Sequence, residues 1–153
     1  MAIIKTDIKQ KTIEKEVTLE GVGLHTGANV KLVFKPGAEN SGFLFERVDL
    51  EGHPKIEADA NYVTNTQRGT CLERNGVVIQ TCEHVLAALV GLEIDNVKIE
   101  LDASEPPIMD GSSKYFVEAL ESVGTKELNE KRKEFVVRDI ISYKDSKSGS
   151  EIT

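Results

Sequence analysis

The sequence predicts an α+β fold, a two-layer sandwich in which one face of a β-sheet is covered by two helices. Segments in which apolar and polar residues alternate, the period of a half-buried strand, fill most of roughly the first 80 residues. Two segments with the apolar period of a helix follow, and each ends at a glycine. No internal repeat or low-complexity tract interrupts these segments, so we expect them to share one core.

The strands are predicted from alternation and from turn residues. Val30, Leu32 and Phe34 alternate with polar residues, which predicts a strand with one buried face. The pair Asn75-Gly76 tolerates positive φ and predicts a tight turn. The predicted strands are 12–19, 29–34, 42–48, 77–79 and 96–101, with small strands and loops in 56–72.

Two helices are predicted in the second half of the chain. The first begins with Thr81 as its N-cap and ends at Gly91, and the second begins near Ser113 and ends at Gly124. Both place leucine, valine and alanine side chains on one side, the stripe that packs on a sheet.

A domain boundary is predicted late in the chain. Residues 125–134 hold three glutamates, three lysines and one arginine, a composition typical of a linker. Residues 135–143 then have strand composition, but a lone strand cannot bury its own apolar face. We therefore predict an N-terminal α+β domain over residues 1–127, followed by a linker and the first strand of a truncated second domain over 128–153.

Composition narrows the partners and the compartment. The net charge of -7 argues against nucleic acid and against an anionic membrane surface as general partners. The sequence has neither an apolar run long enough for a transmembrane helix nor the start of a secretory signal, so we predict a cytoplasmic protein. Cys71 and Cys82 are too few for a disulfide scaffold and are expected to be reduced, partly buried thiols.

Glu83 and His84 are the candidate reactive residues. They lie side by side in the first turn of the first predicted helix, where the partial positive charge of the N-terminus favours an ionised Glu83 and a neutral His84. A neutral imidazole can coordinate a metal ion, and a carboxylate can accept a proton from water. An ordinary interpretation stands beside this one: glutamate is common early in helices, and a lone histidine is more often a structural residue than a ligand. Spacing alone favours the ordinary interpretation.

Four motifs favour the reactive interpretation of Glu83 and His84 over the ordinary one, because they occur together and in order. With them, residues 10 to 140 closely resemble the UDP-3-O-acyl-N-acetylglucosamine deacetylases, zinc-dependent enzymes of lipid A synthesis. The motifs are Gly-Val-Gly-Leu-His-Thr-Gly at 21–27, Thr-Cys-Glu-His-Val-Leu-Ala-Ala-Leu at 81–89, Gly-Leu-Glu-Ile-Asp-Asn at 91–96 and Pro-Ile-Met-Asp-Gly-Ser at 107–112.

The resemblance implies a substrate, a cofactor and roles for two residues. The family hydrolyses the N-acetyl group of UDP-3-O-acyl-N-acetylglucosamine, the committed step towards lipid A. By this resemblance His84 is a zinc ligand and Glu83 is the general base. The family also implies two similar domains that face each other, with the active site between them.

The implied zinc site is incomplete in this sequence. The family completes it with a second histidine and an aspartate four residues further on, whereas this chain has no histidine after His84. Catalytic zinc usually has three protein ligands and a water molecule. We therefore expect an N-terminal fragment that is inactive alone and whose partner is the second half of the same enzyme.

The resemblance also implies residues that border the substrate. His25 in the glycine loop corresponds to a histidine near the family's active site, although it could equally be a polar loop residue bonded to its own backbone. Arg68, Gly69 and Thr70 correspond to a region that borders the substrate, and Arg68 either meets a phosphate or is simply solvated. His53 is expected to be an exposed turn residue. The alternative function is a non-catalytic binding or assembly module with the same two-layer fold.

Overall fold

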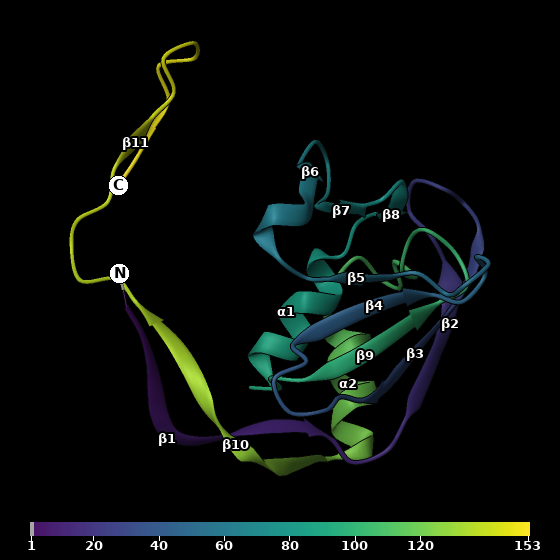
Figure 1. The fold of residues 1–153 in the computed structure, drawn as a ribbon. Helices are drawn as coiled ribbons and strands as arrows, with labels where there is room; N and C mark the ends of the chain where they lie inside the picture. The colour runs from purple at the N-terminus through teal and green to yellow at the C-terminus, as the bar shows by residue number, and fades with distance from the viewer. Residues whose placement is uncertain (1) are drawn as a thin grey trace.

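A five-stranded sheet forms the centre of the molecule in the computed structural model, which describes residues 2–153 (Figure 1). The strand order is β2-β3-β9-β4-β5, and the β4–β9 pair is parallel whereas the other pairs are antiparallel. The strands are β2 (Val17–Val22), β3 (Asn29–Pro36), β4 (Phe43–Arg47), β5 (Lys55–Glu57) and β9 (Val97–Leu101).

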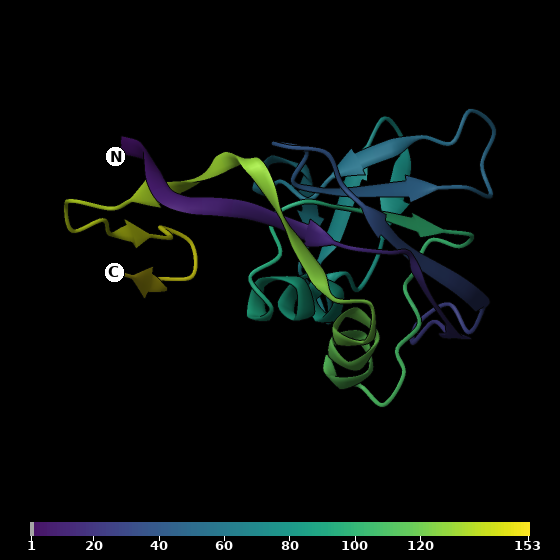
Figure 2. The same ribbon diagram turned by 90° about the horizontal axis from the view of Figure 1, so that it is seen from below.

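Two helices, α1 (Glu83–Gly91) and α2 (Lys114–Val123), cover one face of this sheet (Figure 2). Phe34 of β3 and Phe116 of α2 are both buried, and their rings meet edge to face with centroids 6.4 Å apart. Alternate residues of β9 are also fully buried, as the sequence pattern predicts. The predicted α+β two-layer fold is confirmed.

The opposite face of the central sheet carries ion pairs instead of a helix layer. Lys98 and Glu100 of β9 alternate with its core residues and therefore point to this second face. Lys98 Nζ and Lys35 Nζ each lie 2.7 Å from a Glu100 carboxylate oxygen. Only the helix-covered face contributes to the main core.

A smaller sheet of three strands lies beside the end of the central sheet at which α1 begins (Figure 1). Asn75 and Gly76 form its tight turn with φ values of 53° and 78°, which confirms the predicted hairpin. The loop 66–70 between two of these strands reaches the start of α1. Its elements are β6 (Val63–Asn65), β7 (Cys71–Arg74) and β8 (Val77–Ile79), preceded by a 3₁₀ turn, η1 (Ala60–Tyr62).

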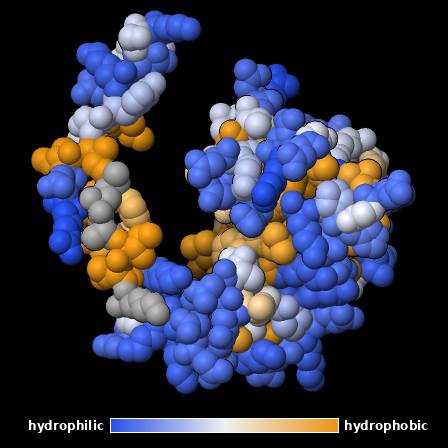
Figure 3. Space-filling model, in the orientation of Figure 1, coloured by the Kyte–Doolittle hydropathy of each residue, from blue (hydrophilic) through white to orange (hydrophobic). Residues whose placement is uncertain are grey.

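Two long strands form an arm that leaves the body of the molecule (Figures 1 and 2). Strand β1 (Ala2–Ile13) pairs antiparallel with β10 (Thr125–Val136). The predicted linker character of residues 125–134 is therefore wrong, because their charges line an exposed two-stranded ribbon. Apolar side chains gather on the far part of the arm (Figure 3), where Ile3, Phe135 and Val137 are exposed.

The predicted strand 12–19 is also wrong as a single element. The chain leaves β1 at Ile13 and enters β2 at Val17, with a turn over residues 14–16. Glu14 N donates to Gly124 O at 3.0 Å, which ties this turn to the end of α2. The alternation across the turn arises from two neighbouring strand ends, both with buried residues.

The last part of the chain is a small hairpin. Strands β11 (Tyr143–Lys144) and β12 (Glu151–Ile152) pair antiparallel beyond the arm. Most of residues 135–143 therefore do not form the predicted strand, since β10 ends at Val136 and the next pairing begins at Tyr143. The division into domains at residue 127 stays a prediction. Within residues 2–153, neither helix has the length and apolar character needed to cross a bilayer.

Candidate active site

The start of α1 lies next to the loop 66–70. Thr81 has a φ of 50°, and Cys82 occupies the N-cap position without a side-chain capping bond. The prediction of Thr81 as N-cap is therefore wrong. The Thr81 hydroxyl does not cap the helix and instead donates a hydrogen bond to the Glu105 carboxylate. Glu83 is the first helical residue.

Glu83 is held on one side only. Thr70 N donates to Glu83 Oε2 at 2.9 Å, and within residues 2–153 the second oxygen, Oε1, has no hydrogen-bond partner. Gly69 lies beside this carboxylate: a Cβ on Gly69 would be in ordinary contact with Glu83 Oε1 at 3.5 Å and slightly tight against Thr81 Oγ1 at 3.3 Å. The carboxylate is thus oriented by the backbone and keeps one free acceptor oxygen.

His84 is half-buried directly after Glu83. Its backbone oxygen accepts a hydrogen bond from Ser113 Oγ at 2.9 Å, which ties the first turn of α1 to the start of α2. Among the described residues, the two nitrogens of its imidazole have no hydrogen-bond partner. The ring is therefore available to a ligand that the protein does not itself supply.

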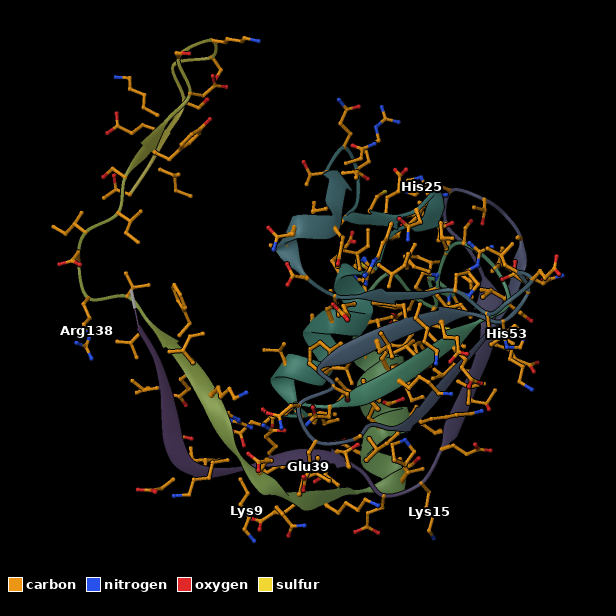
Figure 4. All side chains as sticks on the ribbon, viewed as in Figure 1. Lys9, Lys15, His25, Glu39, His53 and Arg138 are labelled. Atoms are coloured by element: carbon orange, nitrogen blue, oxygen red, sulfur yellow. The ribbon has the colours of Figure 1, made fainter. Side chains whose placement is uncertain are left out.

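His25 approaches the same loop from the other side, at the end of the molecule where Figure 4 labels it. Its Nε2 lies 3.3 Å from Arg68 O, so Nε2 carries the proton when this contact is a hydrogen bond. The Arg68 side chain is exposed and forms no ion pair with another residue of the described part of the chain, 2–153. The structure thus brings His25, Arg68, Gly69 and Thr70 together with Glu83 around one loop.

His53 lies apart from this site, as Figure 4 shows. Its side chain is 59% exposed, it has a φ of 44°, and Nδ1 lies 3.9 Å from Glu46 Oε1. The prediction of an exposed turn residue is confirmed. His53 consequently serves as a natural control for experiments on the other two histidines.

Glu105 is the functional candidate that the sequence analysis missed. Its carboxylate is fully buried and accepts hydrogen bonds from His25 N, Thr26 N, Thr26 Oγ1 and Thr81 Oγ1. Burial raises the pKa of Glu105, but the hydrogen bonds from Thr26, Thr81 and His25 outweigh it and lower the pKa below the ordinary value. The available signal was weak: a single carboxylate directly before two prolines.

Cys82 does not take part as a thiolate. Burial, together with the charge of Glu83, raises the pKa of the Cys82 thiol to about 12. Its Sγ–H donates to Thr70 O at 3.3 Å. Cys71 and Cys82 are both free thiols, as predicted, and Cys82 packs as a buried residue beneath the loop.

The donor set of the described residues does not complete a metal site. Residues 2–153 contain no group of three or more His, Cys, Asp or Glu side chains that could hold a metal ion. His84 offers one imidazole, which is one of the three protein ligands that catalytic zinc usually has. This part of the chain therefore fits zinc as a single ligand only.

A cavity of about 490 Å³ lies elsewhere, beside β2 and β3. Neither Glu83 nor His84 lines it, so the candidate site is defined by contacts and not by this cavity. Its lining residues are Glu20, Gly21, Val22, Asn29, Val30, Lys31 and Asp102.

The fold and these contacts define an α+β domain that presents a carboxylate and an imidazole together at the start of one helix. The sequence profile of the UDP-3-O-acyl N-acetylglycosamine deacetylase family, LpxC, matches residues 10–153. The chain belongs to this family, and the resemblance seen in the four motifs is confirmed.

Individual relatives agree with this assignment. The chain is 43% identical over 145 residues to the bifunctional enzyme LpxC/FabZ of Bacteroides thetaiotaomicron. The aligned region covers 95% of this chain and 32% of that protein. It is 43% identical over 146 residues to the UDP-3-O-acyl-N-acetylglucosamine deacetylase of Pseudoalteromonas atlantica, covering 95% of this chain and 48% of the relative. It is 41% identical over 144 residues to the deacetylase of Myxococcus xanthus, covering 94% of this chain and 46% of that relative. The chain thus spans about a third of the bifunctional relative and about half of the other two.

Proposed function

We propose that this chain is the N-terminal half of a cytoplasmic, zinc-dependent deacetylase that hydrolyses the N-acetyl group of UDP-3-O-acyl-N-acetylglucosamine in lipid A synthesis. The names of the Pseudoalteromonas and Myxococcus relatives support this substrate. One observation carries the proposal: Glu83 and His84 are consecutive residues in the first turn of α1, and the side chain of each keeps a polar atom without a partner among residues 2–153.

Glu83 acts as the general base. The Thr70 N–H holds Oε2 at 2.9 Å, so Oε1 is left to accept a proton from the attacking water. A carboxylate held in this way is suited to general base catalysis, which contributes roughly 10²- to 10⁴-fold to a rate.

His84 would hold zinc through one imidazole nitrogen. When bound, zinc polarises the amide carbonyl and lowers the pKa of a water molecule. The remaining ligands and the acid that protonates the amine come from the second half of the same enzyme, since residues 2–153 hold no set of three ligands. The 153-residue chain alone therefore binds zinc weakly and does not turn over.

The substrate lies against the loop of Arg68, Gly69 and Thr70, with the His25 imidazole beside it. The contact between His25 Nε2 and Arg68 O supports this placement because it joins His25 to the loop whose Thr70 N–H bonds Glu83. The exposed Arg68 guanidinium is available to an anionic part of the substrate.

The test is the zinc content of the full-length protein that contains this chain. We expect about one zinc per chain, lost in His84→Ala and retained in His53→Ala. His53 is a matched control because it is exposed and lies away from the site. Unchanged zinc in His84→Ala would remove His84 from the metal site, and a full-length protein without zinc and without turnover would favour the binding or assembly module.

A further inference from the structure

Glu105 is a buried carboxylate whose partners are all uncharged donors. Its side chain is fully buried, and no described lysine, arginine or histidine side chain forms an ion pair with it. Four donors satisfy it at 2.7 to 3.0 Å: His25 N, Thr26 N, Thr26 Oγ1 and Thr81 Oγ1. An ionised carboxylate accepts all four, because it has about four acceptor sites and no proton.

These donors come from two segments that are distant in sequence. His25 and Thr26 belong to the glycine loop after β2, and Thr81 belongs to the turn before α1. Gln80 N also donates to Ser104 O at 2.8 Å, so the backbone before Glu105 is attached to the same turn. Glu105 thus joins the glycine loop to the start of α1.

The glycine loop is shaped around this carboxylate. A Cβ on Gly23 would lie 2.6 Å from Glu105 Oε2 and 2.3 Å from Thr26 Oγ1, distances that real Cβ atoms do not adopt. Glycine at this position therefore makes room for the carboxylate. The loop therefore fits closely around the Glu105 carboxylate.

The hydrogen bonds of Glu105 close a ring of contacts around the candidate active site. The Thr81 hydroxyl, two residues before Glu83, is held at 2.7 Å, and Thr81 is a non-glycine residue with a φ of 50°. From Glu83 the ring passes to Thr70 by a hydrogen bond, and from Arg68 O to His25 by another. The contact ring consists of Glu105, Thr81, Glu83, Thr70, Arg68 and His25.

We propose that Glu105 is a positioning residue of the deacetylase, which sets the carboxylate of Glu83 and the imidazole of His25 relative to one another through this contact ring. The expected effect on catalysis rests on the proposed function, whereas the contact ring itself does not depend on that function. Glu105 is fully buried, so its role is indirect. It acts through Thr81 on Glu83 and through the backbone of His25 on the imidazole.

Glu105→Gln tests the role of the carboxylate. Glutamine keeps the size of the side chain but turns one acceptor into an NH₂ donor that faces donors. In the full-length enzyme we expect kcat to fall roughly 10- to 100-fold, the effect typical of residues that orient a catalytic group, with KM within about threefold and zinc content unchanged. Glu100→Gln is the matched control, because Glu100 pairs with two lysines on the opposite sheet face.

A second measurement separates this proposal from the proposed function. In the ¹⁵N-labelled chain, Glu105→Gln should shift the amide signals of His25 and Thr26, and also that of Thr70, which has no bond to Glu105 itself and is joined to Thr81 through Glu83 and through Cys82. Shifts confined to His25 and Thr26 would overturn the positioning role. A wild-type enzyme without deacetylase activity would refute the proposed function. The Thr70 amide signal would still show whether Glu105 positions the loop at Glu83.

Thr81 supplies an independent pair of variants should Glu105→Gln fail to fold. Thr81→Val removes one donor and keeps the shape, whereas Thr81→Ser keeps the hydroxyl. We expect Thr81→Val to lower kcat and shift the Thr70 amide signal, and Thr81→Ser to restore both. Equal kcat in Thr81→Val and wild type would overturn the proposal, as would a normal kcat in a folded Glu105→Gln enzyme.

Discussion

Glu83 and Thr70 are separated by 13 residues, yet the Thr70 N–H donates to Glu83 Oε2 at 2.9 Å. This bond joins the first residue of a helix to the loop between two strands of a separate small sheet. It orients the carboxylate by a backbone N–H, which among substitutions of Thr70 only proline would remove.

The first prediction concerns that carboxylate. Glu83→Gln keeps an oxygen that accepts the Thr70 N–H but cannot take a proton from water. In the full-length protein we expect turnover to fall at least about 100-fold, with zinc content and unfolding temperature close to wild type. Glu118→Gln, an exposed carboxylate of α2, is the control for the charge change. Retained turnover in Glu83→Gln would exclude Glu83 as the base.

The second prediction concerns the packing around Gly23. Gly23→Ala places a methyl group 2.6 Å from Glu105 Oε2, so we expect unfolding to become easier by about 1–3 kcal/mol. Gly91→Ala is the control, because its methyl group meets nothing within 4 Å and a helical alanine stabilises by about 0.5–1 kcal/mol. Urea denaturation measures both. Equal stability of the two variants would mean that the loop does not close around Glu105.

The third prediction follows from the lowered pKa of Glu105. The folded state holds this pKa below the ordinary value of 4.5, so the stabilisation is fully present above pH 4.5. As the pH falls from there through the folded-state pKa, the unfolded chain binds the proton more readily and the stabilisation is lost. The stability difference between wild type and Glu105→Gln should therefore be largest at neutral pH and shrink in acid.

Denaturant unfolding at several pH values checks this dependence. Gly91→Ala changes no titratable group, so its difference from wild type should stay constant over the same range. A wild-type to Glu105→Gln difference that stays constant down to pH 3 would contradict the ionised, hydrogen-bonded carboxylate.

The fourth prediction tests the packing of α2 on the sheet. Phe116 is buried and meets Phe34 at a ring-centroid distance of 6.4 Å, so Phe116→Ala should cost about 3–5 kcal/mol of unfolding free energy. The neighbouring Tyr115 is 41% exposed, and Tyr115→Ala should change stability by less than about 1 kcal/mol. Similar losses in both variants would mean that α2 is docked differently.

The fifth prediction concerns the attachment of the arm to the body. Arg132 Nε lies 2.7 Å from Asp95 Oδ1, and Asp95 Oδ2 also accepts the Lys11 N–H at 2.7 Å. Arg132→Met should weaken this attachment by about 1 kcal/mol, since the pair is partly exposed. Amide hydrogen exchange should then become faster in β1 and β10 but not in β9. Unchanged exchange in the arm would show that Arg132 does not hold it.

The local elements of the fold follow from patterns that lie within one segment. The alternation of Val30, Leu32 and Phe34 predicts β3 because one face of that strand is buried. Gly124 ends α2 as expected, with a φ of 71° that glycine adopts without strain. Each of these signals needs no knowledge of a distant partner.

The missed features depend on partners far along the chain. Residues 125–134 have the composition of a linker, and only pairing with β1, more than 100 residues earlier, makes them a strand. Thr81 has the residue type of an N-cap, but the buried Glu105 takes its hydroxyl instead. Glu105 itself collects donors from two loops, and a composition pattern does not reveal which loops meet.

The candidate site was predictable in its residues and not in its geometry. The motif resemblance singled out Glu83, His84, His25 and the 68–70 loop, and the structure brings His25 and this loop together at Glu83. The zinc site and the roles of these residues stay predictions. The patterns in the sequence did not identify Glu105, the carboxylate that joins both sides of the site.

The pairing of β1 with β10 has a consequence for how the chain folds during synthesis. Because Ile13 pairs with Thr125 and Ala2 with Val136, β1 leaves the ribosome long before its partner. Until then it is an unpaired strand that could aggregate with other chains. Three lysines are spaced among the isoleucines of β1, and such charges oppose aggregation before β10 has been synthesised. The sequence of β1 is Ala-Ile-Ile-Lys-Thr-Asp-Ile-Lys-Gln-Lys-Thr-Ile.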